Sequence, residues 1–161
     1  MQTTPQVKTR VQSDARARLA TLFEEDETAW LEAMSALAAA GRASEMDMTN
    51  LGEYLADMAK RDRREVFSRL VTLLTHLLKR VHQSDQHTRS WDATILEQRR
   101  ELRKLLESGK LYNHAVAVLA EAYAEARKQT AVETGLPLAT FQLECPWDVP
   151  RLLSDDEMSD A

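Results

Sequence analysis

Basic and imidazole side chains gather in the middle of the chain and are its best candidates for binding chemistry. His76 and Lys79 lie three residues apart on one predicted helix, and Arg89 comes just before a second. That second helix carries Arg99 and Arg100. Ammonium and guanidinium groups are common ligands of phosphate and other anions. These five residues therefore form a candidate cleft for an anion or for a binding partner.

Arg99 and Tyr123 are candidates for buried polar side chains. Arg99 falls on the apolar stripe of its helix between Ile95 and Leu102, where a cation must be paired. Tyr123 lies on the apolar stripe of a later helix. We expect an acid, a backbone carbonyl or the Tyr123 hydroxyl to hold Arg99. The alternative for Arg99 is that its side chain extends to solvent. The alternative for His76 is that it forms structural hydrogen bonds between helices and binds nothing.

Motifs of known catalytic or metal sites are missing from the sequence. None of the four histidines follows a glutamate by three residues, and there is no His-Glu-x-x-His. His82, Asp85 and His87 could hold a metal loosely, but such a cluster is more typical of an exposed polar loop. The single cysteine, Cys145, precedes Pro146 with no base placed beside it. We expect no catalytic residue, no metal and no cofactor, and the pattern favours a protein that is not an enzyme.

Length and composition favour one soluble helical domain. The chain has 161 residues, with only four glycines and four prolines, and no proline interrupts residues 6–136. No apolar run is long enough to cross a membrane, and no secretion signal is visible. We therefore expect a cytoplasmic protein without membrane contact.

The charge pattern offers two interpretations of the basic middle. Residues 60–104 carry twelve Lys/Arg and six Asp/Glu, whereas the whole chain has a net charge of −5. This pattern favours either an anionic partner such as nucleic acid or helices that neutralise one another in a bundle. Aromatic side chains for stacking on bases are scarce in this segment. Binding of nucleic acid is therefore expected to be weak at most and sensitive to salt.

Apolar periodicity predicts an all-α bundle of about five helices, near residues 26–40, 50–60, 62–81, 90–107 and 111–133. Asn50 with Glu53 predicts the start of the second helix. Charges at i, i+4 spacing favour one continuous helix over residues 50–81, whereas Asp62 with Glu65 favours a break near 60–62. Apolar residues around most of the circumference predict that residues 66–81 form the most buried helix.

Three domain segments are expected from these patterns. Residues 1–21 would be an N-terminal arm, partly helical or disordered, and residues 22–153 a single helical bundle. Residues 154–161 would be a disordered acidic tail. A short helical turn is expected near residues 147–153.

Several short motifs, in this order and spacing, resemble a known bacterial family. They are Ser68-Arg69-Leu70, His76-Leu77-Leu78-Lys79, Gln98-Arg99-Arg100-Glu101 and Glu133-Thr134-Gly135-Leu136-Pro137. Over about residues 22–156 the chain resembles the uncharacterised family called domain of unknown function, family 29. The resemblance implies an all-α bundle and brings no established activity with it.

Taken together, these observations predict a small intracellular helical protein that acts as an interaction module without catalytic activity. Its partner would be an unknown protein or a second copy of itself, as a homo-oligomer. One alternative is a nucleic-acid-associated protein that uses the basic segment of residues 60–104. The other is an enzyme or anion-binding protein with a cleft around His76, Lys79 and Arg99.

Overall fold

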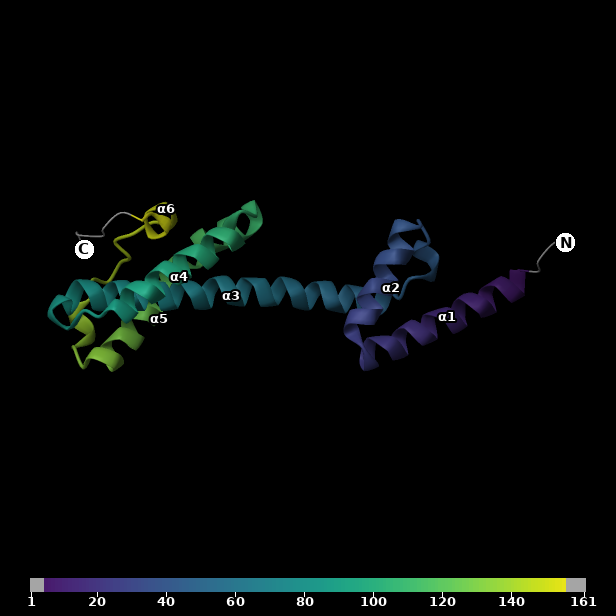
Figure 1. Cartoon of the computed structure of the whole chain (residues 1–161), viewed down its shortest axis with the longest axis horizontal. Helices are drawn as coiled ribbons and strands as arrows, with labels where there is room; N and C mark the ends of the chain where they lie inside the picture. The colour runs from purple at the N-terminus through teal and green to yellow at the C-terminus, as the bar shows by residue number, and fades with distance from the viewer. Residues whose placement is uncertain (1–4, 156–161) are drawn as a thin grey trace. The chain divides into compact units, whose positions relative to one another are not determined.

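The chain is all-α in the computed structural model, which describes residues 5–155, with side chains from residue 10 onwards. The described helices are α1 (Pro5–Glu25), α2 (Glu27–Ala39), α3 (Met48–His82), α4 (Arg89–Leu106), α5 (Gly109–Thr134) and α6 (Val149–Leu153) (Figure 1). Single 3-10 turns follow α2, α3 and α5: η1 (Ala43–Glu45), η2 (Ser84–Gln86) and η3 (Leu138–Thr140). The predicted fold class is therefore confirmed. Residues 156–161 of the predicted acidic tail lie outside the described residues.

The chain divides into two compact units, unit 1 up to Met58 and unit 2 from Ala59 onwards. The sequence predicts one bundle over residues 22–153, but the division falls inside α3. No residue between 52 and 64 is buried. The residues of α3 around the division thus belong to the buried core of neither unit.

A single helix, α3, of 35 residues replaces the two predicted over residues 50–60 and 62–81. The break near residues 60–62 is therefore wrong. Glu65 and Arg69 form the expected i, i+4 ion pair, at 2.9 Å. The same spacing predicts that Arg61 pairs with Asp57 and Glu65, but the carboxylate that Arg61 meets is that of Asp62, at 3.9 Å. Asp62 and Glu65 have the spacing of a capping pair, but inside the long helix α3 they are surface residues that cap nothing.

The N-terminal end of α3 is capped by Asp47 and not by Asn50. The Asp47 Oδ1 accepts a hydrogen bond from the backbone N–H of Asn50, at 3.3 Å. The Asp47 Oδ2 also accepts one from the Asn50 side-chain amide, at 2.6 Å. The helix therefore begins two residues before the predicted start at residue 50, because aspartate is itself a strong N-cap residue.

Unit 1 has a small core between α1, α2 and the start of α3. Its buried apolar residues are Trp30, Met34 and Met46. Asp26 separates the two helices, and its side chain caps α2 by accepting from the N–H of Ala29, at 2.9 Å. Most of the N-terminal arm predicted over residues 1–21 is thus part of helix α1.

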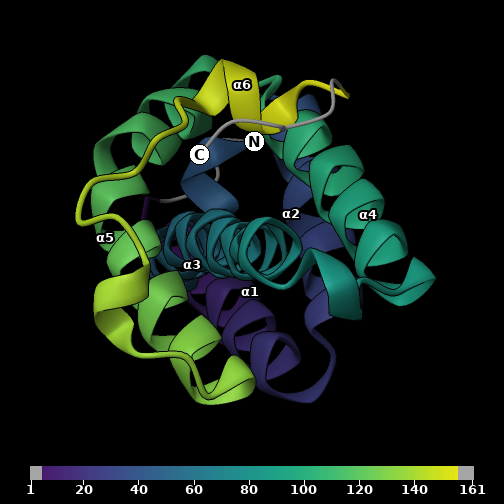
Figure 2. The same cartoon turned by 90° about the vertical axis from the view of Figure 1, so that its left-hand side faces the viewer.

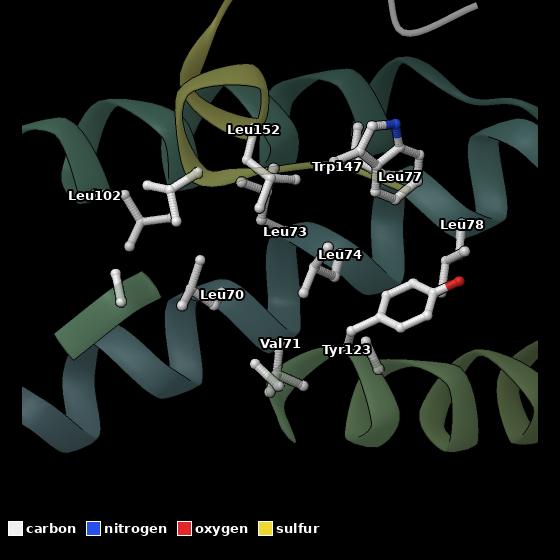
Figure 3. Packing of buried hydrophobic residues seen from close by; sticks show 14 of the residues in the cluster. Leu70, Val71, Leu73, Leu74, Leu77, Leu78, Leu102, Tyr123, Trp147 and Leu152 are labelled. Carbon is white, nitrogen blue, oxygen red and sulfur yellow. The ribbon is translucent and has the colours of Figure 1, made fainter. Parts of the chain in front are cut away.

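Unit 2 is built around the apolar half of α3. Figure 2 looks along α3, with α4 and α5 on either side of it and α6 above. The core side chains from α3 point towards all three of these helices in Figure 3: Leu70, Val71, Leu73, Leu74, Leu77 and Leu78. This burial agrees with the wide apolar face of residues 66–81, since a helix covered on most sides must be apolar on most sides.

Residues 136–155, here called the C-terminal segment, complete unit 2. Gly135 ends α5 with a positive φ of 72°, which glycine adopts without strain. The chain then turns back across the unit. Four side chains of the C-terminal segment are buried in the core: Phe141, Trp147, Val149 and Leu152. The turn predicted near residues 147–153 is helix α6.

Candidate functional site

Lys79 links three helices of unit 2. Its Nζ lies 2.8 Å from the Glu133 Oε2 on α5 and 4.7 Å from the centroid of the Trp91 ring on α4. The other carboxylate oxygen of Glu133 accepts from the Gln129 Nε2, at 2.9 Å. The hydrogen bond from Lys79 holds the pKa of Glu133 below its usual value. The Lys79 side chain is only 14% exposed, and its ammonium group already has an anionic partner.

His76 lies close to this ion pair and has a partner of its own. Its Nδ1 lies 2.9 Å from the backbone oxygen of Thr72. Since a carbonyl oxygen only accepts, Nδ1 carries the proton in this contact. The charged form of His76 also helps to lower the pKa of Glu133. The structure therefore brings His76 and Lys79 together around Glu133.

Arg99 is buried, at 5% exposure, and faces the C-terminal segment. Its Nε donates to the backbone oxygen of Leu152, at 3.0 Å. One turn further along α4, the Arg103 Nε donates to the backbone oxygen of Leu153, at 2.9 Å. The last carbonyls of a helix lack intrahelical partners and carry partial negative charge. Arg99 and Arg103 thus cap the end of α6.

Arg89 and Arg100 lie on the exposed surface of α4. The Arg100 Nε is 3.0 Å from the Glu101 Oε1. Arg89 begins the helix ten residues before Arg99, about 15 Å away along the axis. The five candidate residues therefore do not converge on one cleft: His76 and Lys79 are close together, while Arg99 contacts α6.

Tyr123 and Arg127 hold the other half of the C-terminal segment. Tyr123 is buried, which raises the pKa of its phenol, and its hydroxyl donates to the backbone oxygen of Gln142, at 3.1 Å. The Arg127 Nη2 donates to two more carbonyls, of Leu138 and Phe141, at 3.3 and 3.2 Å. Sequence reasoning missed the role of Arg127. The available signal was its position four residues after Tyr123, on the same helix face.

An open hollow of about 570 Å³ lies between α5 and the C-terminal segment. Sequence reasoning missed it, because its two walls lie more than twenty residues apart in the chain. The lining residues are Val116, Leu119, Ala120, Cys145, Pro146, Trp147, Asp148 and Arg151. Six of these eight are apolar or weakly polar, and two carry opposite charges. The hollow thus combines an apolar surface with one anion and one cation.

Comparison with known proteins shows to which family the chain belongs. Residues 22–157 match the family described as Domain of unknown function DUF29. The chain belongs to DUF29. No curated protein matches the chain, and no solved structure does. The hollow and the Lys79–Glu133 pair both lie within the residues that match DUF29.

Cys145 is the most reactive type of side chain in the hollow of this DUF29 chain. Its thiol donates to the backbone oxygen of Trp147, at 3.2 Å, and burial raises its pKa. A raised pKa keeps the thiol protonated at neutral pH, whereas a nucleophile or a metal ligand needs the thiolate. The hollow therefore presents Cys145 as a half-buried thiol that is hydrogen-bonded to the backbone.

Within residues 5–155 no group of three or more His, Cys, Asp or Glu side chains could hold a metal ion. No helix among those residues is both long enough and apolar enough to cross a membrane.

Proposed function

We propose that this DUF29 chain is a protein-binding module and that a partner docks in the hollow between α5 and the C-terminal segment. The observation that carries the proposal is a hollow that is open to water and lined for the most part by apolar residues. Val116 at this hollow is 53% exposed. A partner that covers such a surface removes apolar area from water, which favours association.

The walls of the hollow are held in place without a partner. Val116, Leu119 and Ala120 lie on α5, whose opposite face packs in the core. The other wall belongs to the C-terminal segment, which side chains of α4 and α5 hold through its backbone carbonyls. A site that is already ordered costs little conformational entropy on binding.

The cations of the basic middle support a protein partner over an anionic one. Most of them already have carboxylate partners among the described residues: Arg61, Arg69, Lys79, Arg80, Arg100, Arg103 and Lys104. Arg99 donates to a backbone oxygen. A phosphate group would have to compete with these internal partners for the cations. A partner that docks in the hollow would not have to displace any of these ion pairs.

Site-specific cross-linking tests the proposal. A photoreactive amino acid is introduced in place of Ala120, in the hollow, and the full chain is expressed in the organism it comes from. We expect a covalent adduct with a protein after illumination. The matched control carries the same group in place of Glu97, which is exposed on α4 and outside the hollow. Equal adducts from both positions, or none from position 120, would contradict a docking role.

A further inference from the structure

We infer that the partner is a second copy of this chain, joined across a twofold axis at the hollow; the inference rests on the proposed docking role. Two copies related by a twofold axis meet through the same surface. Such a surface must therefore be complementary to itself: each charge needs an opposite charge nearby, and each hollow needs a projection nearby. The hollow and its surroundings have both properties.

The charges at the hollow form a self-complementary pair. Asp148 and Arg151 lie three residues apart at α6, and both line the hollow. The Asp148 Oδ1 accepts from the backbone N–H of Arg151, at 2.8 Å, and this bond caps the helix. Within the described part of the chain neither side chain forms an ion pair. Across a twofold axis, the Arg151 side chain of one copy can meet the Asp148 carboxylate of the other, and the symmetry gives two such ion pairs.

An apolar projection lies next to the hollow. Leu143 is 81% exposed and comes two residues before Cys145, which lines the hollow. Two residues of extended chain span at most about 7 Å, so Leu143 is anchored close to the rim. A single exposed leucine is ordinary, but a leucine beside an apolar hollow can enter the same hollow of a second copy. Each copy would then contribute one projection and one hollow.

The same charges disfavour a strongly charged peptide as the occupant. The lining carries one anion and one cation, so the hollow has no net charge to attract a basic or an acidic segment. A second copy, in contrast, brings its own Asp148 and Arg151 in matching positions. Self-association uses both charges, whereas a peptide of one sign would leave one of them facing a like charge.

Sedimentation equilibrium of the full chain tests the inference. Over concentrations from about 1 to 200 µM we expect a monomer–dimer equilibrium. Leu143→Ser should raise the dimer dissociation constant by about tenfold or more, because two leucine side chains lose their apolar contacts. The matched control is Val132→Ser, at a valine that is 84% exposed on α5 and lies about 24 Å along the axis from Val116. This variant should dimerise like the wild type.

Charge variants test the second part of the contact. Arg151→Glu should weaken the dimer by about tenfold, because like charges then face each other in two places. Arg151→Lys keeps the charge and should change little. Adding Asp148→Asn to Arg151→Glu should recover part of the affinity, since asparagine can still cap α6 and removes the repulsion. Circular dichroism of each variant shows that it is folded.

Three outcomes would overturn the inference. One is a wild-type chain that stays monomeric over the whole concentration range. The others are a dimer that neither Leu143→Ser nor Arg151→Glu weakens, and a dimer that Val132→Ser weakens as much as Leu143→Ser does.

If the chain is monomeric while position 120 cross-links to a different protein, the second-copy inference fails and the proposed docking function stands. If position 120 forms no adduct with any protein, the proposed function fails as well.

Discussion

Arginine side chains stabilise the C-terminal segment by donating to its backbone carbonyls. Arg99 and Arg103 reach the end of α6, and Arg127 reaches the turn that follows α5. Segments outside regular secondary structure must find partners for their backbone polar groups, and buried carbonyls left alone are costly. A guanidinium carries five N–H donors on a long side chain, so it can supply several such partners from one helix.

Replacing Arg99 with alanine should destabilise the chain by roughly 1–3 kcal/mol. The variant removes the donor to the Leu152 oxygen and leaves that carbonyl without this bond in a buried site. Urea denaturation followed by circular dichroism measures the free energy of unfolding. The neighbouring Arg100→Ala is the control and should cost less than about 0.5 kcal/mol, because Arg100 is exposed. Equal losses for the two variants would mean that Arg99 contributes no more than a surface residue.

His82 should make stability depend on pH near neutrality. Its ring meets the ring of the buried Phe141 edge-on, with centroids 5.0 Å apart, and burial lowers its pKa below the usual value near 6.5. As the pH falls below 6.5, the unfolded chain binds a proton at this residue before the folded chain does. The contribution to the free energy of unfolding is thus present above pH 6.5 and decreases as the pH falls through 6.5 towards the lowered pKa.

The comparison of wild type with His82→Gln isolates this contribution. Urea denaturation at pH 7 and at pH 5 should show a smaller loss of stability on acidification for the variant. The Glu133 pKa is lowered from an already acidic value, so its contribution is lost mainly below this range. An identical loss in the two proteins would show that His82 titrates alike in the folded and unfolded chains.

The positions of the helices could be predicted from the sequence better than the places where a helix is interrupted. Periodicity placed α4 and α5 to within two residues at each end, because their apolar stripes stop where the polar turns begin. The predicted break in α3 failed because Asp62 and Glu65 fit a cap and an exposed helical surface equally well. Local chemistry does not separate these two cases, and here the i, i+4 pair of Glu65 with Arg69 continues the helix.

The candidate site was only partly visible in the sequence. The burial of Arg99 follows from its place on an apolar stripe, which a single helix reveals. The hollow could not be predicted in this way, because it forms where the C-terminal segment crosses α5. The apolar periodicity of a helix contains no information about that crossing. The ion pair of Lys79 with Glu133 joins residues 54 positions apart and was missed for the same reason.

At the scale of the element, Leu74→Ala should destabilise α3 in its bundle by roughly 2–5 kcal/mol. Leu74 is fully buried among side chains of the unit 2 core, so truncation leaves a cavity as well as removing apolar contacts (Figure 3). Leu55→Ala on the same helix is the control, since Leu55 is largely exposed, and should cost less than about 1 kcal/mol. A loss below about 1 kcal/mol for Leu74→Ala would place that side chain outside the core.

At the scale of the whole molecule, the two units should differ in local stability. The buried apolar core of unit 1 consists of Trp30, Met34 and Met46, whereas that of unit 2 draws on α3, α4, α5 and the C-terminal segment. Hydrogen exchange should therefore be faster for the backbone amides of α2 than for those of residues 66–78 in α3, because a small core opens at lower cost. Equal protection in both regions would show that the chain opens only as one cooperative unit.

The charge distribution of the whole chain predicts weak binding to nucleic acid. Among the described residues of the basic middle, Arg63, Arg64 and Arg89 are exposed and form no ion pair, whereas most of the others are neutralised by carboxylates. Few phosphate contacts give a low affinity, and the binding that remains depends on those contacts and therefore weakens as the salt concentration rises. Fluorescence anisotropy with duplex DNA and with single-stranded RNA should give dissociation constants above about 10 µM at about 150 mM salt. The weak binding should decrease further in Arg63→Ala/Arg64→Ala. Submicromolar binding to either probe at that salt concentration would instead make nucleic acid the partner and the basic middle its site.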